Sequence, residues 1–272
     1  MAASLEGKLA LVTGGSSGIG FAFAKLLADR GARVIITGRS ASVHEAAAEI
    51  GGACNGVIVD LADHAGFEAR LRSATDGWKV DVLVNNAGYN PYLDPSTLNS
   101  QPFAVHETFV SSMLTAYVRL AHLCVPGMAA RGYGRVVNVC SVAAFVTSSM
   151  ESKFNMYGGT KAAVAAFSTS LRRNLREGPE PSRGVHVTAA CPGSVPTRIA
   201  RDAPNSGLAH AHASAAKGEG IALGMASTAD HTAATAWAAV ERNAPYAFNS
   251  RFDKLVALIM QLFTLIQVLF YS

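Results

Sequence analysis

The chain has 272 residues, of which 50% are hydrophobic and 15% are charged, and its formal net charge is +4. A chain of this length and apolar content can bury a full core and lies within the size range of a single α/β domain. The small positive charge comes from dispersed side chains with no Lys/Arg-rich run, which argues against nucleic-acid binding.

Short apolar segments alternate with longer helical patterns through the first two thirds of the chain. The segments are rich in Val, Ile and Leu with little polar alternation, as expected for strands covered on both faces. Right-handed βαβ units then predict an α/β fold with a doubly wound parallel sheet of the Rossmann type. The predicted strands cover 8–13, 33–37, 56–59, 81–84, 135–139 and 185–190, and the predicted helices lie near 18–30, 41–50, 63–75, 103–130 and 152–177.

The pattern changes after the sixth predicted strand. Residues 192–226 are rich in Pro, Gly, Ala, Ser and His, which predicts either a lid over the substrate or a disordered segment. A helix near 228–242 and a short segment at 245–248 follow. We therefore expect one domain over 1–250, including the substrate loop, and an apolar C-terminal helix over 251–272.

The C-terminal segment carries no charge after Lys254, and Leu255–Tyr271 is a run of 17 uncharged residues. This length is at the lower limit for crossing a bilayer. Gln261, Thr264 and Gln267 recur every three residues, so a helix here has a drifting polar stripe on an apolar surface. Three interpretations stay open: a helix packed on the body or on another subunit, a helix in the membrane interface, and a membrane span.

No metal site is expected. The four cysteines are far apart, with no CxxC pair and no zinc spacing, so buried free thiols in a reducing compartment are expected. His210 and His212 form an HxH pair in a polar Ala/Ser-rich loop, where solvated side chains are expected. The cysteines are Cys54, Cys124, Cys140 and Cys191.

Thr13–Gly20, with the sequence TGGSSGIG, follows the first predicted strand and opens the first predicted helix. Glycine lacks a Cβ and permits the sharp turn and the close backbone approach that a pyrophosphate requires. The N-terminus of a helix adds free N–H groups and a favourable dipole. A glycine cluster between a strand and a helix therefore predicts a dinucleotide-binding loop.

The spacing TGxxxGIG resembles that of the short-chain dehydrogenase/reductase family, and further motifs of that family follow in its order. NNAG ends the fourth predicted strand at 85–88, and Ser141 closes VVNVCS after the fifth. Tyr157 and Lys161 form YxxxK, and PGSVPT follows the sixth strand at 192–197. The resemblance covers most of the chain up to about residue 200. The last part of the chain resembles members that act on lipid-like carbonyls, such as the ketosphinganine reductases.

The resemblance also bears on the cofactor. In the family, an acidic residue at the end of the second strand usually binds the ribose hydroxyls of NAD, whereas here Gly38 stands there and Arg39 and Ser40 follow. Arg39 can form a charge-assisted contact with the 2′-phosphate of NADP, and Ser40 can add a hydrogen bond. This implies NADP, with NADPH preferred over NADH. Ser17 stands where many NADP-binding relatives carry a second basic residue.

Other cofactor contacts are implied by the resemblance alone. Asp60 and Leu61 would contact the adenine, while Val195 through its backbone and Thr197 through its hydroxyl would bind the nicotinamide carboxamide. The implied cofactor-binding set is Gly14, Ser16, Ser17, Gly18, Ile19, Gly20, Arg39, Ser40, Asp60, Leu61, Asn85, Ala87, Gly88, Tyr157, Lys161, Pro192, Gly193, Val195 and Thr197.

Tyr157 and Lys161 are four residues apart, one helical turn, so their side chains share a helix face. A tyrosine ordinarily ionises at about pH 10, and a nearby cation lowers that pKa. The resemblance implies that Tyr157 is the general acid/base and that Lys161 lowers its pKa and binds the ribose hydroxyls. Ser141 would orient the carbonyl oxygen of the substrate.

One position departs from the family. Relatives usually carry an asparagine thirteen residues before a proline of the long fourth helix, and its main chain holds a water that supplies protons to the lysine. Counting back from Pro126 gives Met113, and Ser111 or Ser112 could substitute. Because the role runs through the main chain, turnover can survive while the proton relay changes.

These motifs predict an NADP-dependent oxidoreductase of the carbonyl reductase type, which transfers a hydride between NADPH and a carbonyl or secondary alcohol. An apolar ketone or aldehyde is the expected substrate. Alternatives are an NAD-dependent alcohol or hydroxysteroid-type dehydrogenase and a catalytically idle dinucleotide-binding scaffold. Four apolar residues between the serine and the tyrosine are expected either in the pocket wall or in the core: Phe145, Val146, Met150 and Phe154.

The family also implies a homodimer or homotetramer that associates through the fourth and fifth helices. The N-terminal sequence MAASLEGKLALV runs directly into the first predicted strand and lacks the basic-then-apolar layout of a signal peptide. We therefore expect a cytoplasmic protein, peripheral at a membrane if the C-terminal helix binds one.

Overall fold

The computed structural model describes residues 3–89, 102–146, 155–178, 182–195 and 227–271. Its centre is a seven-stranded sheet in the order β3-β2-β1-β4-β5-β6-β7, in which all neighbouring strands are parallel. The doubly wound parallel sheet predicted from the sequence is confirmed. The strands are β1 (Leu9–Val12), β2 (Arg33–Gly38), β3 (Cys54–Ile58), β4 (Val82–Asn85), β5 (Gly134–Val139), β6 (Val185–Cys191) and β7 (Tyr246–Phe248).

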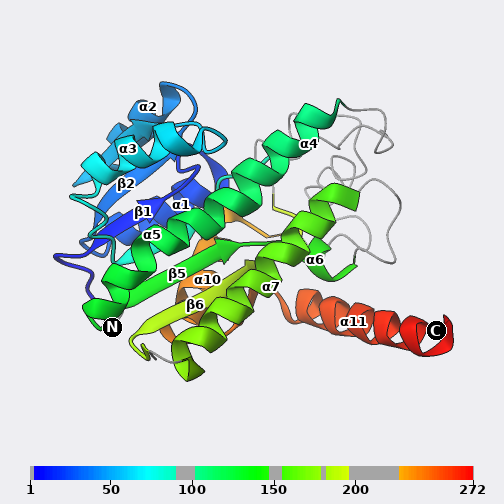
Figure 1. Ribbon diagram of the computed structural model, residues 1–272. Coiled ribbons are helices and arrows are strands. Elements are labelled where there is room, and N and C mark those ends of the chain that lie inside the picture. Colours follow the sequence, from blue (N-terminus) through cyan, green and yellow to red (C-terminus); the bar gives the residue numbers. More distant parts are fainter. Residues whose placement is uncertain (1–2, 90–101, 147–154, 179–181, 196–226, 272) are drawn as a thin grey trace.

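Helices cover both faces of this sheet (Figure 1). Successive residues of β1 point to opposite faces, as in any strand. Ala10 and Val12 join the core cluster that contains α1 (Gly18–Ala28), α2 (Ser42–Ile50) and α10 (Ala229–Glu241). Leu9 and Leu11 join the cluster on the other face, which is covered by α3 (His64–Ala74), α5 (Ala116–Ala130) and α7 (Asn155–Glu177). Both faces of β1 are thus buried, which explains its uninterrupted apolar sequence.

The helix predicted over 103–130 is present but is not uniform. It consists of α4 (Phe103–Val110), a π-helical turn η2 (Ser111–Thr115) and α5, which continues through Pro126. Among the described helices, the continuous stretch Phe103–Ala130 is long and apolar enough to cross a membrane. Its α5 part, however, packs its apolar side chains on the sheet. Sequence periodicity did not reveal the π-helical turn, which widens the backbone by one residue.

Two further helices lie near the carboxyl ends of the strands. The short helix α6 (Ala143–Val146) follows β5 and was not predicted. The C-terminal helix α11 (Arg251–Tyr271) confirms the helical prediction for the tail. It begins after β7, contacts α6 and β7, and extends away from the sheet (Figure 1).

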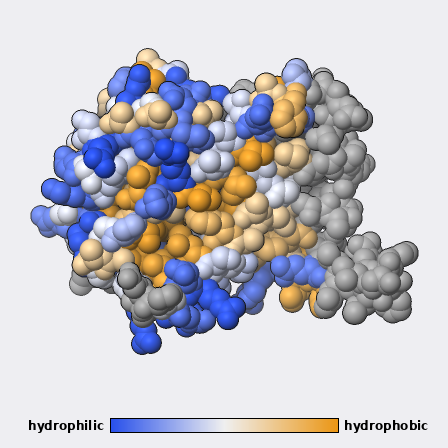
Figure 2. Space-filling model, viewed as in Figure 1, coloured by the Kyte–Doolittle hydropathy of each residue, from blue (hydrophilic) through white to orange (hydrophobic). Residues whose placement is uncertain are grey.

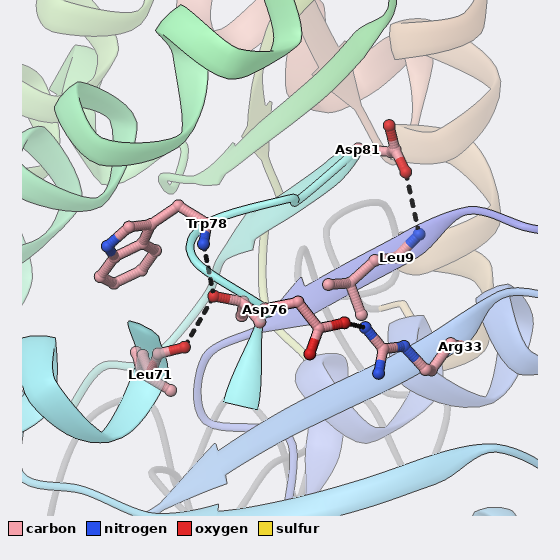
Figure 3. Close-up of polar contacts among 7 residues, drawn as sticks. Leu9, Arg33, Leu71, Asp76, Trp78 and Asp81 are labelled. Carbon is pink, nitrogen blue, oxygen red and sulfur yellow. Dashed lines mark hydrogen bonds and ion pairs between the residues drawn. The ribbon is translucent and has the colours of Figure 1, made fainter. Parts of the chain in front are cut away.

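At the opposite end of the sheet, where the strands begin, the loop between α3 and β4 holds the strands together (Figure 3). The carboxylate of Asp81 accepts a hydrogen bond of 3.1 Å from the main-chain N–H of Leu9 at the start of β1. Asp76 forms an ion pair with Arg33 at the start of β2. The main-chain N–H of Trp78 donates to the Thr75 hydroxyl at 3.1 Å. These contacts hold the amino ends of β1, β2 and β4 together, so the carboxyl ends on the opposite edge meet in a fixed arrangement.

Candidate active site

The strand order reverses between β1 and β4, and ligands of such sheets bind at the carboxyl ends beside this switch point. The turn after β1 has a backbone that only glycine allows. Gly14 has a φ of 65°, and a Cβ there would lie 2.8 Å from the Cα of Ala87. A Cβ at Gly20 would lie 2.2 Å from the main-chain oxygen of Gly14. The result is a cradle of bare backbone, which suits the close approach of a pyrophosphate.

Helix α1 begins directly behind this cradle. Its N-cap is Ser17, whose backbone is extended and whose hydroxyl makes no capping hydrogen bond in the described part of the chain. Gly18 and Ile19 form the first turn. The first main-chain N–H groups of a helix have no intrahelical partner, so the N-terminus of α1 presents donors towards an anion.

Thr13 and Asn86 fasten the end of β4 to this loop. The Thr13 hydroxyl accepts hydrogen bonds from the main-chain N–H groups of Asn86 at 2.9 Å and of Ala87 at 3.0 Å. In return, the Asn86 side-chain amide donates to the main-chain oxygens of Thr13 at 2.9 Å and of Gly14 at 3.2 Å. Our sequence reasoning named neither residue as functional, although both belong to the TG and NNAG motifs.

Asn85 is turned away from this surface into the sheet. Its side chain is fully buried, and its amide donates to Asn138 Oδ1 at 2.8 Å and to the Tyr117 main-chain oxygen at 3.3 Å. The Asn138 amide in turn donates to the Ser168 hydroxyl of α7 at 2.9 Å. This chain of hydrogen bonds joins β4, β5 and α7 and fixes the helix that carries the tyrosine and the lysine.

The end of β2 lies beside the glycine loop. A Cβ at Gly38 would be 3.6 Å from the Ser16 hydroxyl and 3.1 Å from the Cβ of Val43. Ser16, predicted to bind the cofactor, therefore faces the end of β2. The small residue at position 38 leaves space at this point and places no carboxylate there.

Two polar features follow Gly38. The Arg39 side chain is exposed, and its guanidinium carbon lies 5.5 Å from the ring centroid of Tyr89. The Ser40 and Ser42 hydroxyls lie 2.9 Å apart and share a hydrogen bond. Ser42 is the first residue of α2 and was not among the predicted cofactor-binding residues. The feature that could have identified it is a second hydroxyl two residues after Ser40.

Asp60 and Leu61 follow β3 at the same edge of the sheet. Asp60 is exposed, and its carboxylate accepts a hydrogen bond of 2.9 Å from the main-chain N–H of Ala62. Leu61 is buried in the core that includes α3. The turn is thus fixed by its own side chain, and the exposed Asp60 remains next to the end of β2.

Ser141, Tyr157 and Lys161 come together after β5. The hydroxyls of Ser141 and Tyr157 form a hydrogen bond, and the Ser141 hydroxyl also accepts from the main-chain N–H of Ala143 at 3.1 Å. The Lys161 Nζ lies 5.8 Å from the Tyr157 ring centroid and donates to the Val139 main-chain oxygen at 2.8 Å. The strand end and one face of α7 therefore bring the three predicted catalytic residues into one site.

The electrostatics differ from the sequence-based expectation. Burial raises the pKa of Tyr157 to about 12, and the hydrogen bond to Ser141 opposes this only in part. Burial also lowers the pKa of Lys161 to about 8. In the chain without cofactor, burial of the phenol therefore outweighs the lowering that Lys161 was expected to provide. The ammonium group is held on the Val139 main-chain oxygen, and desolvation of the phenol is the larger effect.

Met113 lies in the π-helical turn and is buried against Phe109, with Tyr157 and Met156 packed on the same cluster. A Cβ at Gly88 would be 3.1 Å from the methyl carbon of Met113. Met113 thus forms an apolar wall between the NNAG segment and Tyr157.

The two serines considered as substitutes for an asparagine at position 113 are engaged elsewhere. The Ser111 hydroxyl shares a hydrogen bond of 2.8 Å with His64 Nε2, and the Ser112 hydroxyl donates to the Phe109 main-chain oxygen at 3.1 Å. Neither contact leads to Lys161. The turn of backbone that bears Met113 nevertheless keeps its irregular, π-helical form.

Pro192, Gly193 and Val195 follow β6 beside the serine. The main-chain N–H of Val142, next to Ser141, donates to the Pro192 main-chain oxygen at 3.0 Å. Val195 is buried. The start of the PGSVPT motif thus reaches the end of β5, whereas Thr197 lies outside the described residues.

Phe145 of α6 is half-buried and packs against β7. Its ring packs against the rings of Tyr246 and Phe248 in β7, with centroids 5.7 and 5.8 Å away. These contacts favour the core interpretation for this residue, and its place in a pocket wall stays a prediction. The side chains of Val146, Met150 and Phe154 lie outside the described residues.

The described residues hold no group of three or more His, Cys, Asp or Glu side chains suited to a metal ion. All four cysteines are free thiols. His210 and His212 lie outside the part of the chain that is described.

The model of the short chain dehydrogenase family matches residues 8–206. The chain belongs to this family. Its fold, glycine cradle and serine–tyrosine–lysine site follow the family's order of motifs, and the chain is an oxidoreductase by family.

Curated members resemble this short-chain dehydrogenase over about three quarters of its length. The 3-oxoacyl-[acyl-carrier-protein] reductase of Vibrio cholerae is 35% identical over 200 residues, which cover 73% of this chain and 78% of the relative. The serine 3-dehydrogenase of Rhizobium radiobacter is 36% identical over 191 residues, which cover 70% and 72% of the two chains. The two relatives act on different substrates, so the family alone does not name one.

Solved structures extend the likeness. A short-chain dehydrogenase from Sphingobium yanoikuyae in complex with NADPH is 27% identical, with a TM-score of 0.70 and coverage of 94% of this chain and 95% of that one. L-sorbose reductase from Gluconobacter frateurii, complexed with NADPH and L-sorbose, is 26% identical, with a TM-score of 0.67 and coverage of 96% and 91%. The likeness of fold therefore covers a larger share of the chain than the matches to the curated relatives do.

Proposed function

We propose that this protein is an NADPH-dependent reductase of an apolar ketone or aldehyde, with Tyr157 as general acid/base. The observation that carries the proposal is the convergence of Ser141, Tyr157 and Lys161 beside a backbone cradle at the switch point of the sheet. A catalytically idle scaffold would have no reason to hold a hydroxyl pair and a buried lysine together.

The residues present fit a dinucleotide. Gly14 and Gly20 leave the space that a pyrophosphate needs, and the N-terminus of α1 supplies donors and a favourable dipole. When bound, the nicotinamide would supply or accept a hydride. Besides the glycine cradle, the residues that would hold the cofactor are Ser16, Ser17, Gly18, Ile19, Arg39, Ser40, Asp60, Ala87, Gly88, Tyr157, Lys161, Pro192, Gly193, Val195 and Thr197. Asn85 and Leu61, whose side chains are buried, could contribute only through their main chains.

The preference for NADPH over NADH rests on the end of β2. Arg39 is exposed and makes no ion pair among the described residues, so its charge is available to a 2′-phosphate. Ser40 and Ser42 add hydroxyls next to it. Gly38 itself adds no carboxylate that would repel a 2′-phosphate; the Asp60 carboxylate follows the neighbouring strand β3. Two solved relatives are described in complex with NADPH, which supports this direction.

Proton transfer falls to the tyrosine. Its raised pKa keeps Tyr157 protonated at neutral pH, which suits a group that donates a proton to the carbonyl oxygen during reduction. Ser141 shares a hydrogen bond with that hydroxyl and can hold the same oxygen. Lys161 is mostly protonated at neutral pH and places a positive charge near the developing phenolate, which stabilises it.

The substrate class is inferred from the wall of the site. Met113, Phe109 and Met156 surround Tyr157 with apolar groups. An acyl, alkyl or ring ketone would bury apolar surface against this wall, whereas a polyol would leave its hydroxyls unpaired.

Two association surfaces accompany this function. We place the enzyme domain at 1–250. We assign α11 to the binding of a membrane surface, so that the protein is cytoplasmic and peripheral at the membrane. Four aliphatic side chains of α11 are about half exposed on one helical face: Leu255, Leu258, Ile259 and Leu262. A homodimer or homotetramer through α5 and α7 is the second association; Figure 2 shows apolar side chains gathered over the face where these helices lie in Figure 1.

The test of the proposed function is a titration of the purified protein with NADPH and with NADH, followed by a carbonyl panel with Tyr157→Phe as control. We expect NADPH to bind at least about tenfold more tightly, which corresponds to about 1.4 kcal/mol. We also expect apolar ketones or aldehydes to be reduced by the wild type alone. If NADH binds as tightly as NADPH, the cofactor assignment is wrong; if neither binds, the enzyme assignment is wrong.

A further inference from the structure

We infer that Tyr89 is a positioning residue for Arg39: its ring holds the guanidinium at the place where a 2′-phosphate binds, and so it sets the NADPH preference. The inference rests on the proposed NADPH-dependent function. It adds a residue that lies outside the motif of the second strand, in the segment that follows β4.

Arg39 has little else to hold it. Its side chain is exposed and forms no ion pair or side-chain hydrogen bond with the described residues, while its guanidinium carbon lies 5.5 Å from the centroid of the Tyr89 ring. A free arginine side chain loses up to about 2 kcal/mol of rotamer entropy when it is fixed on a ligand. A ring that already holds the guanidinium plane reduces that loss, because the side chain is ordered before the phosphate arrives.

Tyr89 is itself fixed on its other sides. Its ring meets that of Phe109 edge to face, with centroids 5.6 Å apart. Its side chain also forms a hydrogen bond with Ser112, and burial raises the pKa of the phenol, so the ring stays neutral at physiological pH. Phe109 is fully buried and anchors the stack in the interior. The ring that faces Arg39 is therefore a rigid support.

The contact also crosses the cofactor-binding edge. Arg39 follows β2 and Tyr89 follows β4, and these strands flank β1, which ends in the glycine cradle. The pair thus bridges two strands that are not neighbours. A guanidinium held in this way stays against the Tyr89 ring beside the carboxyl ends of these strands.

This arrangement predicts an effect that is specific to the phosphate. Loss of the ring frees Arg39, and at an exposed site a cation–π contact of this kind corresponds to about a two- to fivefold change in affinity. NADH does not use the 2′-phosphate contact, so its affinity should not depend on the order of Arg39. A role of Tyr89 in folding or in lining the groove would change both cofactors together.

The experiment measures the dissociation constants of NADPH and NADH by nicotinamide fluorescence for the wild type, Tyr89→Leu, Tyr89→Phe, Arg39→Ala and the double variant Arg39→Ala/Tyr89→Leu. We expect Tyr89→Leu to bind NADPH about two- to fivefold more weakly and NADH unchanged. Tyr89→Phe keeps the ring and should behave as the wild type. With Arg39→Ala already present, Tyr89→Leu should cause no further loss, because the residue acts through Arg39.

Equal weakening of both cofactors by Tyr89→Leu, no weakening at all, or an undiminished loss in the Arg39→Ala background would each overturn the inference. If Tyr89→Leu does not fold, Tyr89→Trp replaces it in the test. Tryptophan forms the stronger cation–π contact, so this variant should keep or increase the ratio of NADPH affinity to NADH affinity. The proposed function is judged separately. If the wild type has no NADPH margin, both proposals are wrong; if Arg39→Ala removes the margin and Tyr89→Leu keeps it, only this inference is wrong.

Discussion

Lys161 donates a hydrogen bond of 2.8 Å from its Nζ to the main-chain oxygen of Val139, the last residue of β5. The contact holds the ammonium group below the strand end that leads to Ser141. Lys161 is 4% exposed, so its charge is removed from most of its hydration, which lowers its pKa to about 8. The candidate site therefore contains a buried cation that costs stability in the folded chain.

Replacing this cation should stabilise the protein while it abolishes function. Below pH 8 both the folded and the unfolded wild type carry the Lys161 proton, and the folded state bears the full burial cost. Lys161→Met keeps the apolar stem, so we expect its free energy of unfolding at pH 7 to exceed that of the wild type by about 1–3 kcal/mol, since one pKa unit corresponds to about 1.4 kcal/mol.

The sign of the pH dependence provides the check. Between about pH 8 and the unfolded pKa of 10.5, the folded state releases a proton that the unfolded state keeps, so the wild type gains stability as pH rises. Urea unfolding at pH 7, 8, 9 and 10 measures the free energy of unfolding of both proteins. The excess of the variant over the wild type should shrink as the pH rises above about 8. A difference that stays constant, or a wild type that is the more stable protein at pH 7, would contradict the burial argument.

The raised pKa of Tyr157 predicts different pH profiles for the two directions of the reaction. Reduction uses protonated Tyr157 and should be level between about pH 6 and about pH 8, because the phenol keeps its proton throughout. Alcohol oxidation uses the phenolate, whose fraction rises about tenfold for each pH unit below a pKa of about 12. Oxidation rates should therefore climb through about pH 9 to 10.

The matched variant is Tyr157→Phe. It should lose about 10²- to 10⁴-fold in kcat in both directions, with little change in cofactor affinity. Initial rates measured from both directions at saturating substrate test this prediction. An oxidation profile that levels off below about pH 8 would mean that the complex lowers the pKa of Tyr157 far more than burial raises it.

The glycine cradle can be tested with two alanine substitutions. In a helix interior Gly→Ala usually stabilises by about 0.5–1 kcal/mol. At Gly20, however, the added Cβ would lie 2.2 Å from the Gly14 main-chain oxygen and 2.4 Å from the Asn86 amide nitrogen, so Gly20→Ala must displace the loop. We expect it to lose cofactor affinity at least about tenfold and to lower the melting temperature.

Gly159→Ala is the control for that substitution. Gly159 also lies in a helix, and a Cβ there meets nothing within 4 Å. It should keep cofactor affinity and raise the melting temperature slightly. The reasoning would be refuted if Gly20→Ala behaved like this control in calorimetry and in cofactor titration.

The sequence predicted the strands well because both faces of the sheet are covered. Residues such as Leu9, Ala10, Leu11 and Val12 are all buried, and this leaves an unbroken apolar run that a surface strand would not have. The glycine turn was equally visible, because the close approach of Gly14 and Gly20 permits no other residue. In both cases one local constraint leaves its mark directly in the sequence.

Features that depend on distant parts of the chain were not visible in this way. The π-helical turn at Met113 arises within a continuous apolar helical pattern, so periodicity gives no sign of it. The contact between Arg39 and Tyr89 joins segments fifty residues apart. The effect of burial on the pKa of Tyr157 was not visible either, because spacing places Lys161 nearby but shows neither the desolvation of the phenol nor the contact of the ammonium group with Val139.

The exposed apolar face of α11 gives the last prediction. Leu258, Ile259 and Leu262 are each about half exposed, and Arg251 and Lys254 at the base of the helix add positive charge suited to anionic head groups. The full chain should cosediment with vesicles that contain anionic lipid. Replacing the three aliphatic residues with Gln should reduce this partitioning by roughly two orders of magnitude, because each forfeits about 1 kcal/mol of apolar burial.

The control is Val118→Gln on α5, which removes an apolar side chain of comparable exposure from a different surface and should leave partitioning unchanged. Sedimentation velocity of the same proteins identifies the alternative. If the triple variant changes the mass of the assembly while the wild type does not bind vesicles, α11 is a contact between subunits, and its assignment to a lipid surface is wrong. If the full chain neither binds vesicles nor changes mass, the exposed face of α11 serves neither association, and the apolar C-terminal sequence has another cause.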